Sequence, residues 1–183
     1  MTMTAPAPEP IPGTTWQQVA EIVVYGTPAG QGQITFLGKG RGSKHTNEKW
    51  LKPWRRDIIL AARDATGAHG YTDWDGICLT CRIEKKLHGL YANIPTRVDI
   101  TITVPKPKTA PKRRQTWPIT RYSTDIDHHA RACLDALSDS GVMKDDSQVI
   151  DLSIRKAYPN EHPDALAEPG AVIRLYTLPG ATR

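Results

Sequence analysis

Strand and helix patterns follow one another along this chain in an order that limits the folds it can adopt. Residues 97–104 (RVDITITV) alternate apolar β-branched side chains with polar ones, which is typical of a half-buried strand. An apolar run at 21–27, closed by turn residues, predicts an earlier strand. Further strands are predicted at 77–83, 148–157 and 171–178, the last two as a closing pair.

Two segments show the spacing of amphipathic helices. The first begins near Asn47 and covers about 18 residues, with apolar side chains on one face and basic ones on the other. The second is predicted from His128 to Gly141, with Asp127 as N-cap and the glycine as its stop. This order of elements predicts an α/β (α+β) fold, a single small domain whose mixed β-sheet carries two main helices packed on it. The apolar face of the first helix comprises Trp50, Trp54, Ile58, Leu60, Ala61 and Ala65.

A length of 183 residues fits one folded domain. Residues 1–15 are rich in proline and lack periodicity, so a flexible leader is predicted before a domain at 16–183. The glycine-rich stretch 28–47 is expected to stay mobile until a ligand binds it. The chain shows no secretory signal and no membrane-spanning run, and its three cysteines suit a reducing compartment. We therefore expect no membrane partner and a cytoplasmic location.

Basic residues are concentrated in two tracts, and the formal net charge is +5. Residues 105–121 hold six lysines and arginines and no acidic residue, and residues 39–56 form the second tract. Either tract alone is equally compatible with a solvated surface. Together they flank an acidic cluster and favour a polyanionic partner, because clustered cations gain affinity for phosphates through counterion release.

The acidic cluster lies around the second predicted helix. Asp125 and Asp127 precede it in an extended segment, so their carboxylates should project to the same side at the helix N-terminus. Asp145 and Asp146 follow the helix, and a strand running back can return them close to the first pair. Carboxylates that converge repel one another unless a cation neutralises them, and a set of oxygen ligands favours Mg²⁺ or Mn²⁺ over zinc. Taken singly, these residues also have ordinary explanations as helix caps and turn residues.

The acidic cluster belongs to a longer series of elements, which comprises Asp125-x-Asp127, Arg131, Asp135-Ala136-Leu137, Gly141-Val142 and Asp145-Asp146-Ser147-Gln148-Val149. This series resembles the signature of the RusA-type Holliday junction resolvases, which are crossover junction endodeoxyribonucleases. The resemblance implies a small α/β homodimer with a magnesium site in each subunit, which Mn²⁺ can share, and paired symmetric nicks in four-way junctions during DNA recombination and repair. It also implies that Asp125, Asp127 and Asp146 are the metal-binding catalytic acids, and it suggests a phage origin, hence the host cell cytoplasm.

Two positions depart from the family pattern. His128 stands where the pattern usually has Asn, and we interpret it as a solvent-facing residue of the first helical turn. Arg131 stands where the pattern has Lys, and we count it among the catalytic residues because it can contact the scissile phosphate or orient a carboxylate. An ion pair with Asp135, one turn further on, is the alternative for Arg131.

The DNA-binding residues are predicted from the basic tract and from one strand end that matches a basic position of the family. A non-catalytic branched-DNA-binding protein is the main alternative function, and a phosphatase or nucleotide hydrolase is a lesser one. Cys78 and Cys81 lie three apart on a predicted strand and therefore face opposite sides, which disfavours a zinc site, while Cys133 is expected in the core. The predicted DNA contacts are Lys106, Lys108, Lys112, Arg113, Arg114 and Lys156.

Overall fold

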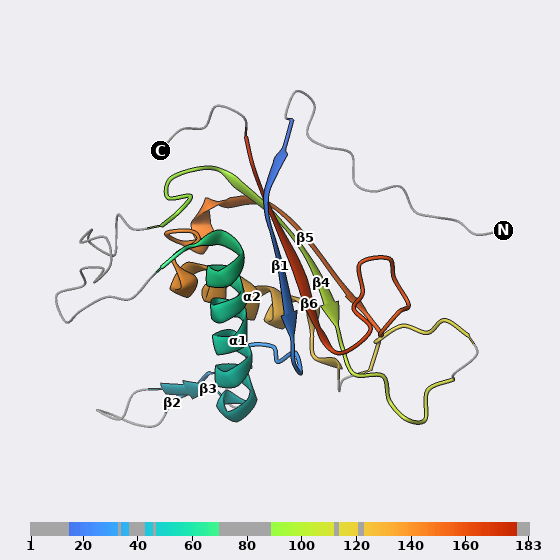
Figure 1. Cartoon of the computed structure of the whole chain (residues 1–183). Helices are drawn as coiled ribbons and strands as arrows, with labels where there is room; N and C mark the ends of the chain where they lie inside the picture. Colours follow the sequence, from blue (N-terminus) through green and yellow to red (C-terminus); the bar gives the residue numbers. More distant parts are fainter. Residues whose placement is uncertain are drawn as a thin grey trace.

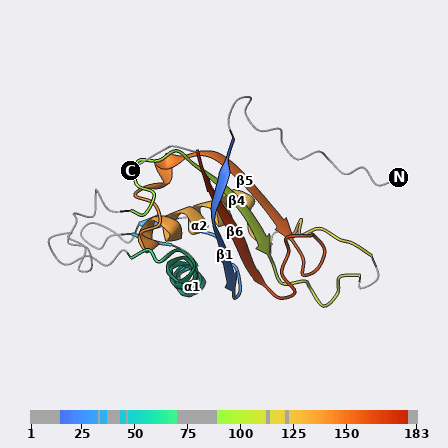
Figure 2. The ribbon, with the colours of Figure 1, turned by 45° about the horizontal axis from the view of Figure 1, so that its top comes forward.

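The computed structural model describes residues 15–32, 34–36, 43–45, 47–69, 89–111, 114–120 and 123–178. The predicted leader, the predicted strand at 77–83 and the pair Cys78 and Cys81 lie outside the described residues. A mixed four-stranded sheet forms the centre of the molecule, and both helices pack on one of its faces (Figures 1 and 2). The predicted fold class is therefore confirmed.

The strands of this sheet are β1 (Gln17–Tyr25), β4 (Thr96–Thr103), β5 (Val149–Ala157) and β6 (Gly170–Thr177), in the order β1-β6-β4-β5. Strand β6 is antiparallel to both β1 and β4, whereas β4 and β5 are parallel. Strands β1, β4 and β5 therefore run in one direction and end at the same edge of the sheet. The predicted closing pair is present as β5 and β6, but β4 lies between them, because the crossover through a helix places β5 on the far side of β4.

A short antiparallel hairpin lies within the glycine-rich stretch that was expected to be mobile. Its strands are β2 (Ile34–Phe36) and β3 (Ser43–His45), and it stands beside the start of the first helix (Figure 1). This part of the chain therefore contains regular structure as well as loop.

Helix α1 (Glu48–Thr66) buries a narrower stripe than its sequence predicts. The side chain of Trp50, placed on the apolar face by the prediction, is 63% exposed, and Leu60 is exposed as well. Residues that recur at three and four positions share one face of a helix, and Trp50 lies beside that face. The buried residues of α1 are Leu51, Trp54, Ile58 and Ala62.

Helix α2 (Ile126–Ser140) ends at Gly141, whose φ of 85° is the left-handed conformation expected of a terminal glycine. It begins slightly earlier than predicted, with Asp125 rather than Asp127 at the N-cap. Cys133 is fully buried on its inner face, and burial raises the pKa of this thiol to about 12, as expected of a core cysteine. No helix in the described part of the chain is long and apolar enough to cross a membrane.

Two arginines of α1 hold the C-terminal end of α2. Arg55 Nη1 donates to Asp135 Oδ2 at 3.1 Å, and its Nη2 donates to Asp139 Oδ2 at 2.6 Å. Arg63 Nε donates to the Ser140 carbonyl oxygen at 3.1 Å, which satisfies one of the carbonyl groups that a helix end leaves without a partner. These bonds fix the direction of α2, so that its N-terminus lies at the edge where β1, β4 and β5 end.

Candidate active site

Three potential metal ligands meet at the N-terminus of α2. Asp125, Asp127 and His128 each offer a ligand atom, and these atoms lie within 4.8 Å of one another. The Asp125 side chain makes no capping hydrogen bond, although it occupies the N-cap position, and Asp127 is 59% exposed. Both carboxylates are therefore available to a cation, and the donor set suits a divalent ion that is bound through one or two carboxylates and water.

His128 is not the solvent-facing residue that its sequence position predicts. Its ring is partly buried, and Nε2 lies 3.8 Å from Asp127 Oδ2. Residues at the start of a helix turn their side chains back along the axis, and here the loop at 28–32 limits where the ring can go. The imidazole therefore belongs to the acidic cluster, which no periodicity in the sequence indicates.

The backbone that presents Asp125 is strained and clamped. Thr124 has a φ of 58°, which is unusual for a β-branched residue and costs on the order of 1–3 kcal/mol. Lys156 Nζ donates to the Thr124 carbonyl oxygen at 2.6 Å and to Ser123 Oγ at 3.0 Å. His129 Nε2 lies 2.9 Å from the Ser123 carbonyl oxygen, and burial lowers the pKa of this ring, so a neutral imidazole donates this bond. The buried His129 and the partly buried Lys156 thus hold the segment that positions the first carboxylate.

Lys156 was predicted as a DNA contact, and the structure places it inside the site. Its ammonium group is engaged by Ser123 and Thr124, and burial lowers its pKa, an effect that the nearby Asp125 carboxylate opposes. The lysine reaches this position because β5 ends at the same edge where α2 begins. Its observed contacts are those of a positioning residue for Asp125.

The loop at 28–32 packs directly on the start of α2. Gln31 donates its backbone N–H to the His128 carbonyl oxygen at 2.8 Å, and Asn47 Oδ1 accepts from the Gly32 N–H at 3.0 Å. Gly30 has no room for a side chain, because a Cβ there would lie 2.8 Å from His128 Cβ and closer still to Thr124 Cγ2. The glycine therefore permits the close approach of this loop to the acidic cluster.

Replacing this glycine should damage the site. We expect Gly30→Ala to push Thr124 and His128 out of place, to lower the free energy of unfolding by about 1–3 kcal/mol, and to reduce metal-dependent activity of the folded protein. Gly67→Ala is the matched control, because Gly67 has a φ of 68° but nothing within 4 Å of an added Cβ. Urea denaturation should show a loss for both variants, and only Gly30→Ala should lose metal affinity. Equal metal affinity in the two variants would contradict this role of Gly30.

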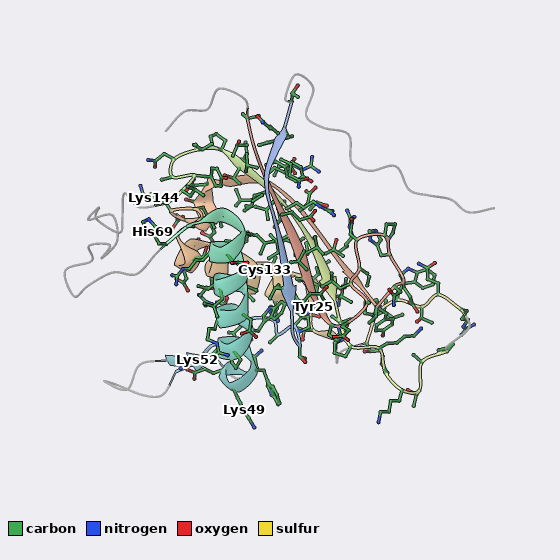
Figure 3. The ribbon with its side chains drawn as sticks, viewed as in Figure 1. Tyr25, Lys49, Lys52, His69, Cys133 and Lys144 are labelled. Atoms are coloured by element: carbon green, nitrogen blue, oxygen red, sulfur yellow. The ribbon has the colours of Figure 1, made fainter. Side chains whose placement is uncertain are left out.

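Asp146 does not join the acidic cluster within one chain. It begins a 3-10 turn, η3 (Asp146–Gln148), which adjoins the C-terminal end of α2, and its neighbour Asp145 caps that turn by accepting from the Ser147 N–H. Helix α2 has 15 residues, so at about 1.5 Å per residue its two ends lie roughly 22 Å apart. Figure 3 shows Lys144, next to this turn, far from Tyr25 at the end of β1. Strand β5 follows α2 and runs back toward the site, and its whole length is needed to cover the distance between the two ends of α2. Lys156, near the end of β5, therefore reaches the site, whereas Asp146, before its start, does not.

Arg131 lies one turn beyond Asp127 and is exposed. Within the described residues no ion pair involves Arg131, and the Asp135 carboxylate is paired with Arg55 instead. The alternative explanation of Arg131 as the partner of Asp135 is therefore not what the structure shows. Its guanidinium is available to an anion that approaches the acidic cluster.

The basic tract supplies fewer exposed charges than its sequence suggests. Lys106 forms an ion pair with Glu161 and lies over the Tyr158 ring, whereas Lys108 and Arg114 are exposed. Lys112 and Arg113 lie outside the described residues. Trp117 and Ile119 are exposed in the same tract, so it presents apolar as well as cationic side chains.

The comparison with known families agrees with this site. Residues 79–166 match the family model described as endodeoxyribonuclease RusA. The matched segment contains the acidic cluster, Arg131, the turn with Asp146, and Lys156. A search of curated proteins gave no significant match. The segment that carries the acidic cluster is therefore similar to the RusA endodeoxyribonuclease family.

Proposed function

We propose that this protein is a magnesium-dependent, structure-specific endodeoxyribonuclease that resolves Holliday junctions by paired symmetric nicks in DNA recombination and repair. The observation that carries the proposal is the cluster of Asp125, Asp127 and His128 within the matched segment. Its action on DNA places it inside the cell, in the cytoplasm. A bound Mg²⁺ would activate water and stabilise the charge that develops on the phosphodiester. Mn²⁺ should substitute, because it accepts both carboxylate and imidazole ligands.

Each residue of the cluster has a distinct role in this proposal. Asp125 and Asp127 hold the metal, and His128 orients Asp127 or adds a ligand. Arg131 receives the scissile phosphate, since a guanidinium can form two parallel hydrogen bonds with phosphate oxygens. Lys156 holds the segment that precedes Asp125 and so keeps that carboxylate in place. Its positive charge also attracts the phosphate.

Asp146 can act at a metal only if a second copy of the chain brings it there. Strand β5 is an edge of the sheet, and none of the described strands pairs with its outer side. Ile150 and Leu152 are 60% and 41% exposed along it, and a second copy that pairs with this edge would cover part of their apolar surface.

Two-fold pairing of β5 with its copy would bring the separated acids together. Antiparallel pairing places the start of one β5, which follows Asp146, against the end of the other, where Lys156 contacts Thr124. We therefore propose a homodimer in which Asp146 of the partner subunit completes each site. Such a dimer carries two equivalent sites, which matches the approximate two-fold symmetry of a four-way junction.

Cleavage of a four-way junction against linear duplex in Mg²⁺ tests the proposed function. The expected result is a pair of nicks at symmetric positions in the junction, little cleavage of the duplex, and no reaction with a chelator present. Junction binding without cleavage in Mg²⁺ or Mn²⁺ would favour the non-catalytic alternative. Hydrolysis of small phosphate esters in place of DNA would favour the phosphatase alternative.

The basic tract should contribute electrostatic affinity. Neutralising Lys112, Arg113 and Arg114 together is expected to weaken binding to junctions of any sequence, with each lost phosphate contact reducing the log-log salt slope by about 0.9. The measurement is the dissociation constant over a range of salt concentrations in Ca²⁺. A slope equal to that of the wild type would assign these three residues to a solvated surface.

A further inference from the structure

A cavity of about 220 Å³ opens beside the acidic cluster. Its walls come from the segments that follow β1, β4 and β5 and from the segment that precedes α2. In open sheets with parallel strands, ligands bind at this carboxyl edge, where the connections diverge. The cavity therefore occupies the part of the fold that is shaped for a ligand.

The lining of the cavity suits a flat, mainly apolar ring. Pro28, Val104, Pro107 and the buried Tyr158 form apolar walls, and the hydroxyl groups of Thr27 and Thr120 lie at the exposed rim. Lining of this kind, mostly apolar with a few polar groups, is typical of small-molecule sites. The volume equals roughly seven water molecules at about 30 Å³ each, which is enough for one heterocyclic ring.

The cavity shares two residues with the segment that presents the first metal ligand. Ser123 and Thr124 line it, and Asp125 is the next residue in the chain. A base is connected to its phosphates through a single sugar, so a base held in the cavity would place an adjacent phosphate near Asp125.

We propose that this cavity receives one unpaired base of the DNA strand that is cut, next to the scissile phosphate. The proposal rests on the proposed nuclease function and adds the feature that sets nucleotide preference at the cleavage point. An unpaired base at a branch point is a favourable occupant, because extracting a base from an intact duplex costs stacking and pairing energy. Contact with the apolar walls of the cavity stabilises the base once it has entered.

The first test combines a filled cavity with a missing base. Thr27→Trp and Thr120→Trp fill the cavity from its exposed rim, and Gln18→Trp, at the start of β1, is the matched control. On junctions cut by the wild type, an abasic nucleotide next to the cleavage point should lower the cleavage rate about tenfold. Each rim variant should show a similar loss on the intact junction and no additional loss on the abasic one, since both changes remove the same contact. Gln18→Trp should behave as the wild type.

The second test needs no cleavage. Junctions carrying 2-aminopurine at each branch-point nucleotide in turn are bound in Ca²⁺, and one position should change its fluorescence with wild type and Gln18→Trp but not with the rim variants. Three outcomes would overturn the base-binding cavity. The wild type could cut abasic junctions at the full rate, or the losses from the abasic nucleotide and from a rim variant could multiply when both are combined. The third outcome is a fluorescence change that is still seen with the rim variants. These outcomes leave magnesium-dependent junction cleavage by the wild type intact, whereas absence of that cleavage rejects the proposed function itself.

Discussion

Asp127→Asn should abolish magnesium-dependent cleavage of a four-way junction while junction binding in Ca²⁺ or without metal is retained or becomes tighter. The amide that replaces the carboxylate is a poor ligand for a hard divalent cation, so the metal is lost from the cluster with Asp125 and His128. The same change removes a negative charge from the place where a phosphate must approach, which reduces repulsion. Cleavage rates and junction dissociation constants measured on the same preparation check both parts.

Asp64→Asn is the matched control for this variant. Asp64 is an exposed acid on α1 outside the acidic cluster, so the substitution has the same chemistry without the metal role. It should cut junctions at the wild-type rate. Undiminished cleavage by Asp127→Asn would reject the assignment of the metal site, and loss of cleavage in both variants would show that the assay responds to charge and not to the site.

Mixing inactive Asp127→Asn subunits with inactive Asp146→Asn subunits should restore nicking. In a dimer whose sites combine Asp125 and Asp127 of one subunit with Asp146 of the partner subunit, a mixed dimer carries one site with both substitutions and one with neither. The intact site should cut one strand of a supercoiled cruciform plasmid, so open circles should form with little linear product. Each variant alone should leave the plasmid supercoiled.

The mixing experiment separates two arrangements of the same three acids. If Asp146 acted within its own subunit, every site of every mixed dimer would contain one substitution, and no activity would return. Sedimentation of the mixture on a junction provides the control, because exchange of subunits must occur for the comparison to hold. Restored nicking requires the shared site, and its absence in exchanged dimers would remove Asp146 of the partner subunit from the proposal.

The local elements of the fold could be predicted from the sequence because each is encoded by residues close together in the chain. The alternation at 97–104 became β4, and the helical spacing before Gly141 became α2, with the glycine in the left-handed conformation at its end. Asp125 and Asp127 lie together as predicted, but not in one extended segment, because Asp125 is the N-cap and Asp127 already belongs to the first turn of α2. For the first helix the same reasoning predicted the span and part of the buried face, since Trp54 and Ile58 are buried but Trp50 lies just outside the buried stripe.

Only the tertiary structure decided which distant residues meet at the site. Periodicity reports how a segment faces its surroundings, but it carries no information on strand order, and the position of β4 between β5 and β6 determines where each strand end lies. Because of that order, Lys156 contacts Thr124. The length of α2 separates Asp146 from the acidic cluster, although the sequence predicted that it would lie there. Gly30 packs against a segment that is remote in the chain, and His129 binds a backbone carbonyl group. Neither contact leaves a pattern in the sequence. The candidate metal ligands could therefore be proposed from the residues, whereas their grouping depends on the packing of helix against sheet.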